Sequence, residues 1–236
     1  MLAVILAGGY GKRLRPLTDR IPKNLVEIAG KPIIVRQIEW LSRQGFKRFL
    51  LLTGYLSDKL IDYLGNGDKY GITIEYSKEE EPLGTGGAIR NAWEKISDEE
   101  VFLLVNGDII TDLSIYPLLN ELEKDSDIVG VLSAVPLPSP YGVINFDRDG
   151  YIIRFIEKPL IDDYWINAGV YVFRRSVYEY LPVKGDLERT TLPRLASEHK
   201  LKVVKYMGVL WRSIDSFKDV EQTSQLIEKL ESRIED

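Results

Sequence analysis

Residues able to hold phosphate groups come early in the chain. The glycine-rich segment Leu6-Ala7-Gly8-Gly9-Tyr10-Gly11 is followed by Lys12, Arg13 and Arg15. Glycines let backbone N–H groups approach a phosphate closely, and the basic side chains add positive charge. A dinucleotide fingerprint needs glycine in place of Leu14, and a Walker A loop needs Ser or Thr in place of Arg13. The segment therefore predicts a phosphate site of another kind, or else a tight turn with solvated basic residues.

A second loop of small residues, Gly84-Thr85-Gly86-Gly87, could let a flat nucleotide base lie against the backbone. Three glutamates precede it: Glu79, Glu80 and Glu81. A carboxylate could accept both donors of a guanine edge, whereas thymine and uracil each offer one. The alternative is a helix start with a glycine turn, preceded by a solvated acidic run.

A carboxylate follows the most apolar run of the chain. Val101–Val105 is apolar throughout, as in a strand buried on both faces, and Asn106-Gly107-Asp108 comes next. Ligands of open α/β sheets collect at the carboxyl ends of the strands. Asp108 is therefore a candidate for holding Mg²⁺ against phosphate oxygens, with a turn or capping aspartate as the alternative.

The elements that must position these residues alternate along the whole chain, as a mostly parallel α/β sheet requires. Helices are expected after Pro32 and at 57–64, 87–96 and 216–234, where Ser216 and Asp219 are spaced as a capping box. No internal repeat or linker divides the sequence, so a single domain is expected over residues 1–236. Strands are expected at 2–7, 49–53, 72–76, 101–105, 127–135, 142–146, 152–157 and 166–173.

Composition excludes several classes of function. The net charge of −5 argues against a general grip on nucleic acid, so no nucleic-acid partner is expected. The chain has no cysteine, which rules out thiolate chemistry, and its one histidine, His199, lies in a polar stretch. No apolar run reaches membrane length, so we expect no membrane partner and a cytoplasmic location.

Longer motifs carry a resemblance to a known family. Gly11 to Thr18 together with Pro22-Lys23-Asn24-Leu25 resembles the signature G-x-G-T-R-L-x-P-L-T…P-K-P-L of the nucleoside-diphosphate-sugar pyrophosphorylases, which are sugar-1-phosphate nucleotidyltransferases. Lys12 replaces the usual threonine and Asn24 the usual second proline. Further matches follow in the family's order: Glu81-Pro82-Leu83-Gly84-Thr85, Asn106-Gly107-Asp108, Tyr141-Gly142-Val143, Phe155-Ile156-Glu157-Lys158-Pro159 and Asn167-Ala168-Gly169-Val170-Tyr171.

The resemblance implies a Rossmann-like three-layer α/β/α fold with a mostly parallel mixed sheet, and the catalytic domain without a C-terminal β-helix. It implies that Arg13, Lys23 and Asp108 are catalytic and converge in one cleft with Lys158, which would hold the sugar phosphate. The implied nucleotide-binding residues are Leu6, Ala7, Gly8, Gly9, Gly11, Arg13, Lys23, Glu81, Gly84 and Thr85. The implied residues for the sugar phosphate are Asn106, Gly142, Glu157, Lys158 and Asn167.

The metal site departs from the family pattern at one position. Trp211-Arg212-Ser213-Ile214-Asp215 resembles W-x-D-I-G, in which the aspartate two places after tryptophan supplies a second metal ligand. Ser213 stands there, and Asp215 lies on the same face if the segment is extended. The expected ligands of Mg²⁺ are therefore Asp108 and Asp215, with Asp108, water and the triphosphate as the alternative.

The expected partners are a nucleoside triphosphate and a sugar 1-phosphate, which would react to give a nucleotide sugar and pyrophosphate. GTP with mannose 1-phosphate is favoured. Thymidylyl or uridylyl transfer to glucose 1-phosphate or an amino-sugar 1-phosphate is the alternative, and a non-catalytic subunit that binds nucleotide sugars is a second. A glycosyltransferase would need an Asp-x-Asp pair at a strand end, but the pairs at 125–127 and 147–149 lie in turn-like segments.

Self-association is left open by the last helix. Val220, Ile227, Leu230 and Ile234 could form an apolar stripe there, so a homo-oligomer is one expectation. Covering the domain's own core is the favoured use of that stripe.

Overall fold

The computed structural model describes residues 1–235, with side chains through residue 232, so Asp236 and the side chain of Ile234 lie outside it. Seven strands form the main sheet, in the order β12-β8-β11-β6-β1-β4-β5. Only β11 runs antiparallel to its neighbours, which confirms the expected mostly parallel mixed sheet. The strands are β1 (Leu2–Ala7), β4 (Arg48–Thr53), β5 (Thr73–Lys78), β6 (Val101–Asn106), β8 (Gly130–Pro138), β11 (Leu160–Arg174) and β12 (Leu201–Lys205).

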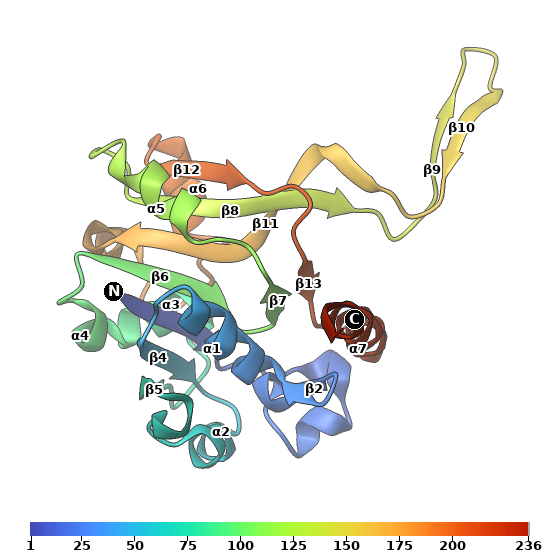
Figure 1. The fold of residues 1–236 in the computed structure, drawn as a ribbon. Coiled ribbons are helices and arrows are strands. Elements are labelled where there is room, and N and C mark those ends of the chain that lie inside the picture. The colour runs from blue at the N-terminus through green and yellow to red at the C-terminus, as the bar shows by residue number, and fades with distance from the viewer. Residues whose placement is uncertain (236) are drawn as a thin grey trace.

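Helices cover both faces of this sheet, as Figure 1 shows. On β1, Ala3 and Ile5 pack in one core cluster with α1, α2 and α5, whereas Leu2 and Val4 pack in a second with α3, α4 and α6. This alternation is the period of two that places successive side chains on opposite faces of a strand. The helices are α1 (Ile33–Arg43), α2 (Ser57–Leu64), α3 (Gly84–Asn91), α4 (Trp93–Ile96), α5 (Tyr116–Glu123), α6 (Thr191–Ser197) and α7 (Phe217–Glu235).

A third core cluster joins the chain's start to its end. Leu14 and Val26, from the segments after β1, pack with Ile214 and with Ile227 of α7. The capping box forms at the start of α7: Asp219 Oδ2 accepts the Ser216 N–H at 2.7 Å, and Ser216 Oγ accepts the Asp219 N–H at 3.4 Å. Ile227 is buried and Val220 packs against this cluster, so the apolar stripe covers the domain's own core, with Leu230 39% exposed.

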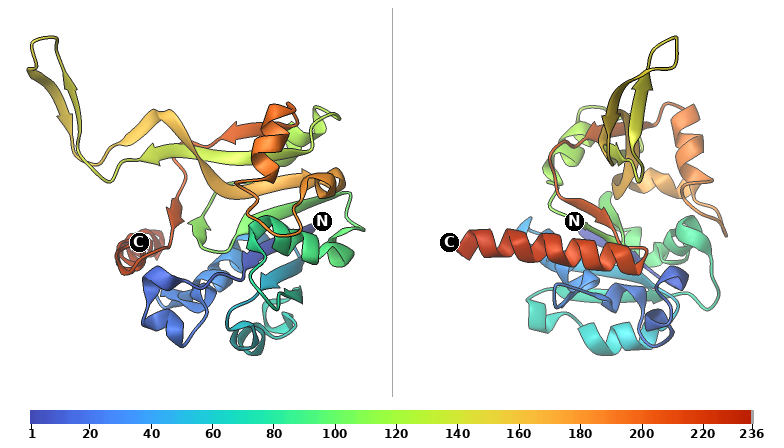
Figure 2. Two further views of the ribbon diagram at one scale, coloured as in Figure 1. Left: turned by 180° about the vertical axis from the view of Figure 1, so that it is seen from behind. Right: turned by 90° about the vertical axis from the view of Figure 1, so that its right-hand side faces the viewer.

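Three short strand pairs complete the described part of the chain. β2 (Glu27–Ile28) pairs with β3 (Lys31–Pro32), and β7 (Ile109–Thr111) pairs with β13 (Trp211–Ser213). β9 (Val143–Phe146) and β10 (Ile152–Ile156) pair only with each other and project from the body, as all views in Figures 1 and 2 show. Among the described residues, no helix is both long and apolar enough to cross a bilayer.

Candidate active site

A cavity of about 400 Å³ lies at the carboxyl ends of β1, β4 and β6. Its walls include the glycine-rich loop, the segment at Lys23, the start of α3, the turn after β6 and the segment after β13. Eight of the ten expected nucleotide-binding residues line it, whereas Ala7 and Glu81 do not. The lining residues from that set are Leu6, Gly8, Gly9, Gly11, Arg13, Lys23, Gly84 and Thr85.

Glycine is required in the first loop by its backbone and by its neighbours. Gly11 has a φ of +59°, and a Cβ there would lie 2.9 Å from Thr18 Cγ2. The Thr18 hydroxyl donates to the Gly11 carbonyl at 2.8 Å and holds the turn that precedes Lys12–Leu14. The loop therefore has a fixed course that directs Arg13 toward the cavity.

Lys23 links the two carboxylates expected to hold a metal. Its Nζ lies 2.8 Å from Asp108 Oδ2 and 2.9 Å from Asp215 Oδ1. Arg13 also reaches Asp215 Oδ1, at 2.9 Å. The lysine side chain is only 11% exposed, so its charge lies at the floor of the cavity rather than in bulk solvent. Arg13, Lys23, Asp108 and Asp215 thus form one cluster.

The turn that carries Asp108 is held by close backbone packing. A Cβ at Gly107 would lie 2.1 Å from the Leu6 carbonyl oxygen, so no larger residue fits. The Asn24 amide donates to the Gly107 carbonyl at 2.7 Å. Asn24, one of the two departures from the family signature, therefore supports the Asp108 turn directly.

Asp215 reaches the site although Ser213 stands at the usual ligand position. The Ile214 N–H donates to the Asp108 carbonyl at 2.8 Å, which brings the two segments together. Ser213 Oγ donates to Asp215 Oδ2 at 3.0 Å and leaves Oδ1 facing the cations. Burial alone would raise the pKa of Asp215, but the hydrogen bond and charge of Lys23, with Ser213 and Arg13, hold it below its ordinary value.

The residues present fit a Mg²⁺ ion. Two carboxylate oxygens converge on one point, now the position of Lys23 Nζ, and Mg²⁺ is commonly held by one or two carboxylates plus phosphates and water. No group of three or more acidic or histidine side chains suited to a metal occurs in the described part of the chain. The donor set therefore suits a cation that arrives with the triphosphate.

Glu79, not Glu81, is the glutamate of the acidic run that lines the cavity. Its backbone N–H donates to the Thr53 carbonyl at 2.9 Å and so prolongs the pairing of β5 with β4. Burial raises the pKa of Glu79, although the Leu83 N–H, which donates to its Oε2 at 3.2 Å, acts in the opposite direction. Glu81 is exposed and pairs with Lys184 at 3.0 Å.

We expected Glu81 of the acidic run at the nucleotide, whereas Glu79 is the member of that run that lines the cavity. We expected the strand at 72–76, whereas β5 continues to Lys78. Glu79 is therefore the first residue past the carboxyl end of a strand, where ligands of such sheets collect. A longer strand assignment would have found it.

The second glycine loop packs against the chain more closely than a base alone would require. Gly84 has a φ of +75°, and a Cβ there would lie 2.6 Å from the Gly185 carbonyl carbon. The N–H groups of Gly86 and Gly87 both donate to the Gly185 carbonyl. These two N–H donors are thus occupied, and the small residues allow the loop at Gly185 to pack closely on α3.

The residues expected to hold the sugar phosphate are divided between two places. Asn106 lines the cavity, and its buried Oδ1 has no hydrogen-bond partner among the described residues. Asn167 is exposed on β11, where its Nδ2 donates to the Tyr171 hydroxyl at 2.6 Å and its Oδ1 accepts the Gly169 N–H. A Cβ on Gly169 would touch Asn106, so the two asparagines belong to adjoining parts of one surface.

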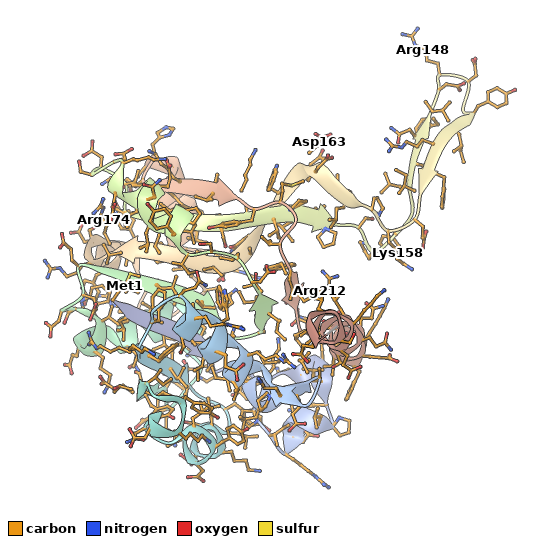
Figure 3. The ribbon with its side chains drawn as sticks, in the orientation of Figure 1. Met1, Arg148, Lys158, Asp163, Arg174 and Arg212 are labelled. Carbon is orange, nitrogen blue, oxygen red and sulfur yellow. The ribbon has the colours of Figure 1, made fainter. Side chains whose placement is uncertain are left out.

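Gly142, Glu157 and Lys158 lie at the base of the β9–β10 hairpin and do not line the cavity. A Cβ on Gly142 would lie 2.6 Å from the Phe155 ring and 3.0 Å from Glu157 Oε2, which explains the glycine by packing. Lys158 is exposed and pairs with Glu157 at 3.2 Å. Figure 3 places Lys158 beside the hairpin rather than at the body, so only three of the four residues expected to converge do so.

The chain is similar to known proteins over nearly its whole length. Residues 2–229 match the family described as nucleotidyl transferase. The chain is 39% identical over 223 residues to "Mannose-1-phosphate guanylyltransferase catalytic subunit beta" of Drosophila pseudoobscura pseudoobscura, with 92% of this chain and 60% of the relative covered. It is 37% identical to "Mannose-1-phosphate guanyltransferase" of Candida albicans, with 93% and 62% covered. The chain thus spans about three fifths of the length of these relatives.

Two solved structures are similar in fold. HddC from Yersinia pseudotuberculosis, complexed with GMP-PN, has a TM-score of 0.74 and 30% identity, with 96% of this chain and 99% of that chain covered. A putative glucose-1-phosphate thymidylyltransferase from Bacillus anthracis has a TM-score of 0.75 at 21% identity, with 96% and 95% covered, and supports the fold alone. The expected three-layer α/β fold is confirmed.

Proposed function

The chain belongs to the nucleotidyl transferase family, and we propose that it transfers GMP from GTP to mannose 1-phosphate, giving GDP-mannose and pyrophosphate. The cluster of Arg13, Lys23, Asp108 and Asp215 at the floor of one cavity carries this proposal, because it gathers cations and metal ligands where a triphosphate would bind. The names of the mannose-1-phosphate relatives and the guanine-type ligand of HddC support the choice of substrates.

The reaction is an in-line displacement at phosphorus. A phosphate oxygen of the sugar 1-phosphate attacks the α-phosphorus, the bond from that phosphorus to the bridging oxygen breaks, and pyrophosphate leaves with the electron pair. The nucleophile is already an anion, so no side chain has to remove a proton. The chain's task is to position two polyanions and to neutralise the charge that develops between them.

Each residue of the cluster has a part in that task. Arg13 and Lys23 hold the β- and γ-phosphates and stabilise the leaving pyrophosphate. Asp108 and Asp215 would hold Mg²⁺, which would neutralise triphosphate oxygens when bound. Asn106 lines the cavity with a buried Oδ1 that has no hydrogen-bond partner among the described residues, and it is proposed to contact the sugar phosphate. Gly142, Glu157, Lys158 and Asn167 are proposed to contact the sugar phosphate, which requires the base of the hairpin to approach the cavity.

Glu79 selects the base. A carboxylate accepts both the N1–H and the N2–H₂ groups of guanine, and Glu79 is the glutamate of the acidic run that lines the cavity. Glu81, exposed and paired with Lys184, has no part in this proposal.

Pyrophosphate release tests the activity and its specificity together. GTP, ATP, UTP, CTP and dTTP are each combined with the 1-phosphates of mannose, glucose, N-acetylglucosamine and heptose in the presence of Mg²⁺. Fastest release with GTP and mannose 1-phosphate is expected. Preference for dTTP or UTP with a glucose phosphate would favour the alternative, and GTP binding without pyrophosphate release would identify a non-catalytic subunit.

A further inference from the structure

An aromatic pair joins the glycine-rich loop to the segment that follows β4. The rings of Tyr10 and Tyr55 lie 5.0 Å apart between their centroids, at an interplanar angle of 34°. This separation is within the range of favourable aromatic pairs. Tyr10 lines the cavity and is 40% exposed, whereas Tyr55 does not line it. Part of the Tyr10 ring is therefore accessible to a ligand in the cavity, while Tyr55 packs against that ring.

Two further contacts restrain the Tyr10 ring. The Tyr55 N–H donates to the Gly8 carbonyl at 3.4 Å, which ties the segment after β4 to the glycine-rich loop. Lys12 Nζ lies 5.6 Å from the centre of the Tyr10 ring, within the range of a cation–π contact. Lys12 stands where the family signature has threonine, so this departure adds a cation beside the ring. The ring is thus held in place before a ligand binds, which lowers the entropy lost on binding.

The carboxylate proposed to select the base lies against the same two segments. A Cβ on Gly54 would lie 2.7 Å from Glu79 Oε1, and a Cβ on Gly8 would lie 2.9 Å from the same oxygen. Gly54 immediately precedes Tyr55, and Gly8 comes two residues before Tyr10. A base whose edge is bound by Glu79 therefore lies next to the segments that carry the aromatic pair.

The charged part of a nucleotide suits a different part of the cavity. Arg13 and Lys23 both reach Asp215 Oδ1 at 2.9 Å, and these two cations suit phosphate groups. The face of an aromatic ring is electrically negative and is a poor partner for phosphate. It is a good partner for a nucleotide base, because every base has a flat π-face. The chemistry of the Tyr10 ring therefore matches the base.

We propose that Tyr10, backed by Tyr55, stacks on the base of the bound nucleoside triphosphate. This inference rests on the proposed function and adds a residue to it, since Tyr10 is the only residue from 6 to 11 that the family resemblance does not assign to the nucleotide. Stacking depends on the area of the two rings rather than on hydrogen-bond donors at the edge of the base. Tyr10 therefore contributes affinity for the base, whereas Glu79 contributes the preference for guanine.

Calorimetric titration with GTP and with inorganic tripolyphosphate, each in the presence of Mg²⁺, tests the stack. Tyr10→Ala should weaken GTP binding about ten- to a hundred-fold, the effect of losing one contact between a base and an aromatic ring, and should leave tripolyphosphate binding unchanged. Tyr10→Phe, which keeps the ring, should bind GTP as wild type does. Tyr63→Ala is the matched control, because Tyr63 is 41% exposed on α2 and does not line the cavity.

The outcomes separate this inference from the proposed function. If Tyr10→Ala bound GTP as tightly as wild type, the stack would be wrong. Equal losses of GTP and tripolyphosphate affinity would also overturn it, because Tyr10 would then act on the shape of the loop or on the phosphates. Steady-state kinetics should show an unchanged preference for GTP over ATP in Tyr10→Ala, and a changed preference would place Tyr10 at the edge of the base instead. A wild type that bound tripolyphosphate but not GTP would contradict the proposed function itself.

Discussion

At the scale of single residues, Lys23 has both a structural role and a proposed chemical role. In the free protein its ammonium separates Asp108 from Asp215, two carboxylates that would otherwise repel each other. In the proposed reaction Asp108 and Asp215 would hold a metal ion, which would supply that neutralisation and leave Lys23 to bind the phosphates. Removal of the Lys23 side chain should therefore lower both turnover and stability. The loss of stability should be smaller with Mg²⁺ than without it.

Replacing Lys23 with alanine should lower kcat about 10²–10³-fold, by analogy with the loss of one donor that stabilises developing charge. The same variant should melt at a lower temperature than wild type without metal, and Mg²⁺ should recover more of that loss than it adds to wild type. Lys31→Ala, which removes only the pair with Glu39 outside the cavity, is the control for turnover and melting. A Lys23 variant within a few-fold of wild-type turnover would show that the assigned role is wrong.

Glu79→Gln should reduce kcat/KM for GTP about ten- to a hundred-fold, because a hydrogen bond to a charged acceptor is worth about 1.5–3 kcal/mol. An amide can accept from guanine only at its oxygen and presents a donor to the second guanine donor. Glu81→Gln is the matched control, since it removes the same charge two residues away, at an exposed position. Steady-state kinetics with GTP and ATP measure the preference for GTP. If the Glu79 and Glu81 variants kept the same preference for GTP, the assignment of Glu79 to the base would be wrong.

The same substitution has a pH-dependent effect on stability. Burial raises the pKa of Glu79 above its ordinary value, so the folded protein is penalised when this carboxyl is ionised. This loss of stability is absent when the pH is below the ordinary carboxyl pKa. It is complete once the pH has risen through the raised pKa of Glu79. Glu79→Gln should therefore melt higher than wild type at pH 7 and not at pH 4. Melting curves that differ equally at both pH values would refute ionisation of a buried carboxyl as the cause.

At the scale of elements, the sequence predicted what local patterns determine. Apolar runs located β1, β4, β5, β6 and β8, and the capping box located the start of α7, because buried strands and capping boxes have short-range signatures. The parallel edge strand β12 was not expected. The end of β5 was missed, because Ser77 and Lys78 are polar residues that remain paired with β4. The expectation that Asp215 replaces the ligand missing at Ser213 assumed an extended segment after Trp211, and Trp211–Ser213 is extended because β13 pairs with β7, about a hundred residues earlier.

Asp219 links the start of α7 to Asp215, a proposed metal ligand. Its carboxylate accepts the N–H groups of Asp215 and Ser216 and the hydroxyl of Ser216. Asp219→Ala should lower the free energy of unfolding by about 1 kcal/mol, as the loss of a helix cap does, and should weaken Mg²⁺-dependent GTP binding by freeing Asp215. Glu221→Ala, on the same helix, is the control. If calorimetric titration with GTP and Mg²⁺ gave the wild-type affinity for Asp219→Ala, Asp219 would act only as a helix cap.

At the scale of the whole molecule, the structure divides into a body that holds the cavity and an arm, the hairpin of β9 and β10 at residues 143–156, that does not line it. The sequence placed strands at 142–146 and 152–157 but could not show that they leave the main sheet. Their alternation of apolar and polar residues is equally compatible with a strand inside a sheet.

This division predicts that the arm can be removed without harm to the nucleotide site. Val143 lies opposite Ile156, so an Asn-Gly turn placed between them should close a shortened hairpin in place of residues 144–155. The shortened chain should melt within a few degrees of wild type and bind GTP with Mg²⁺ equally well, because the deleted residues neither join a core cluster nor line the cavity. Thermal denaturation and calorimetric titration measure the two properties separately. A shortened chain that lost its fold or its GTP affinity would show that body and arm form one cooperative unit. Retained GTP affinity with an increased KM for the sugar phosphate would show that the arm acts on the second substrate.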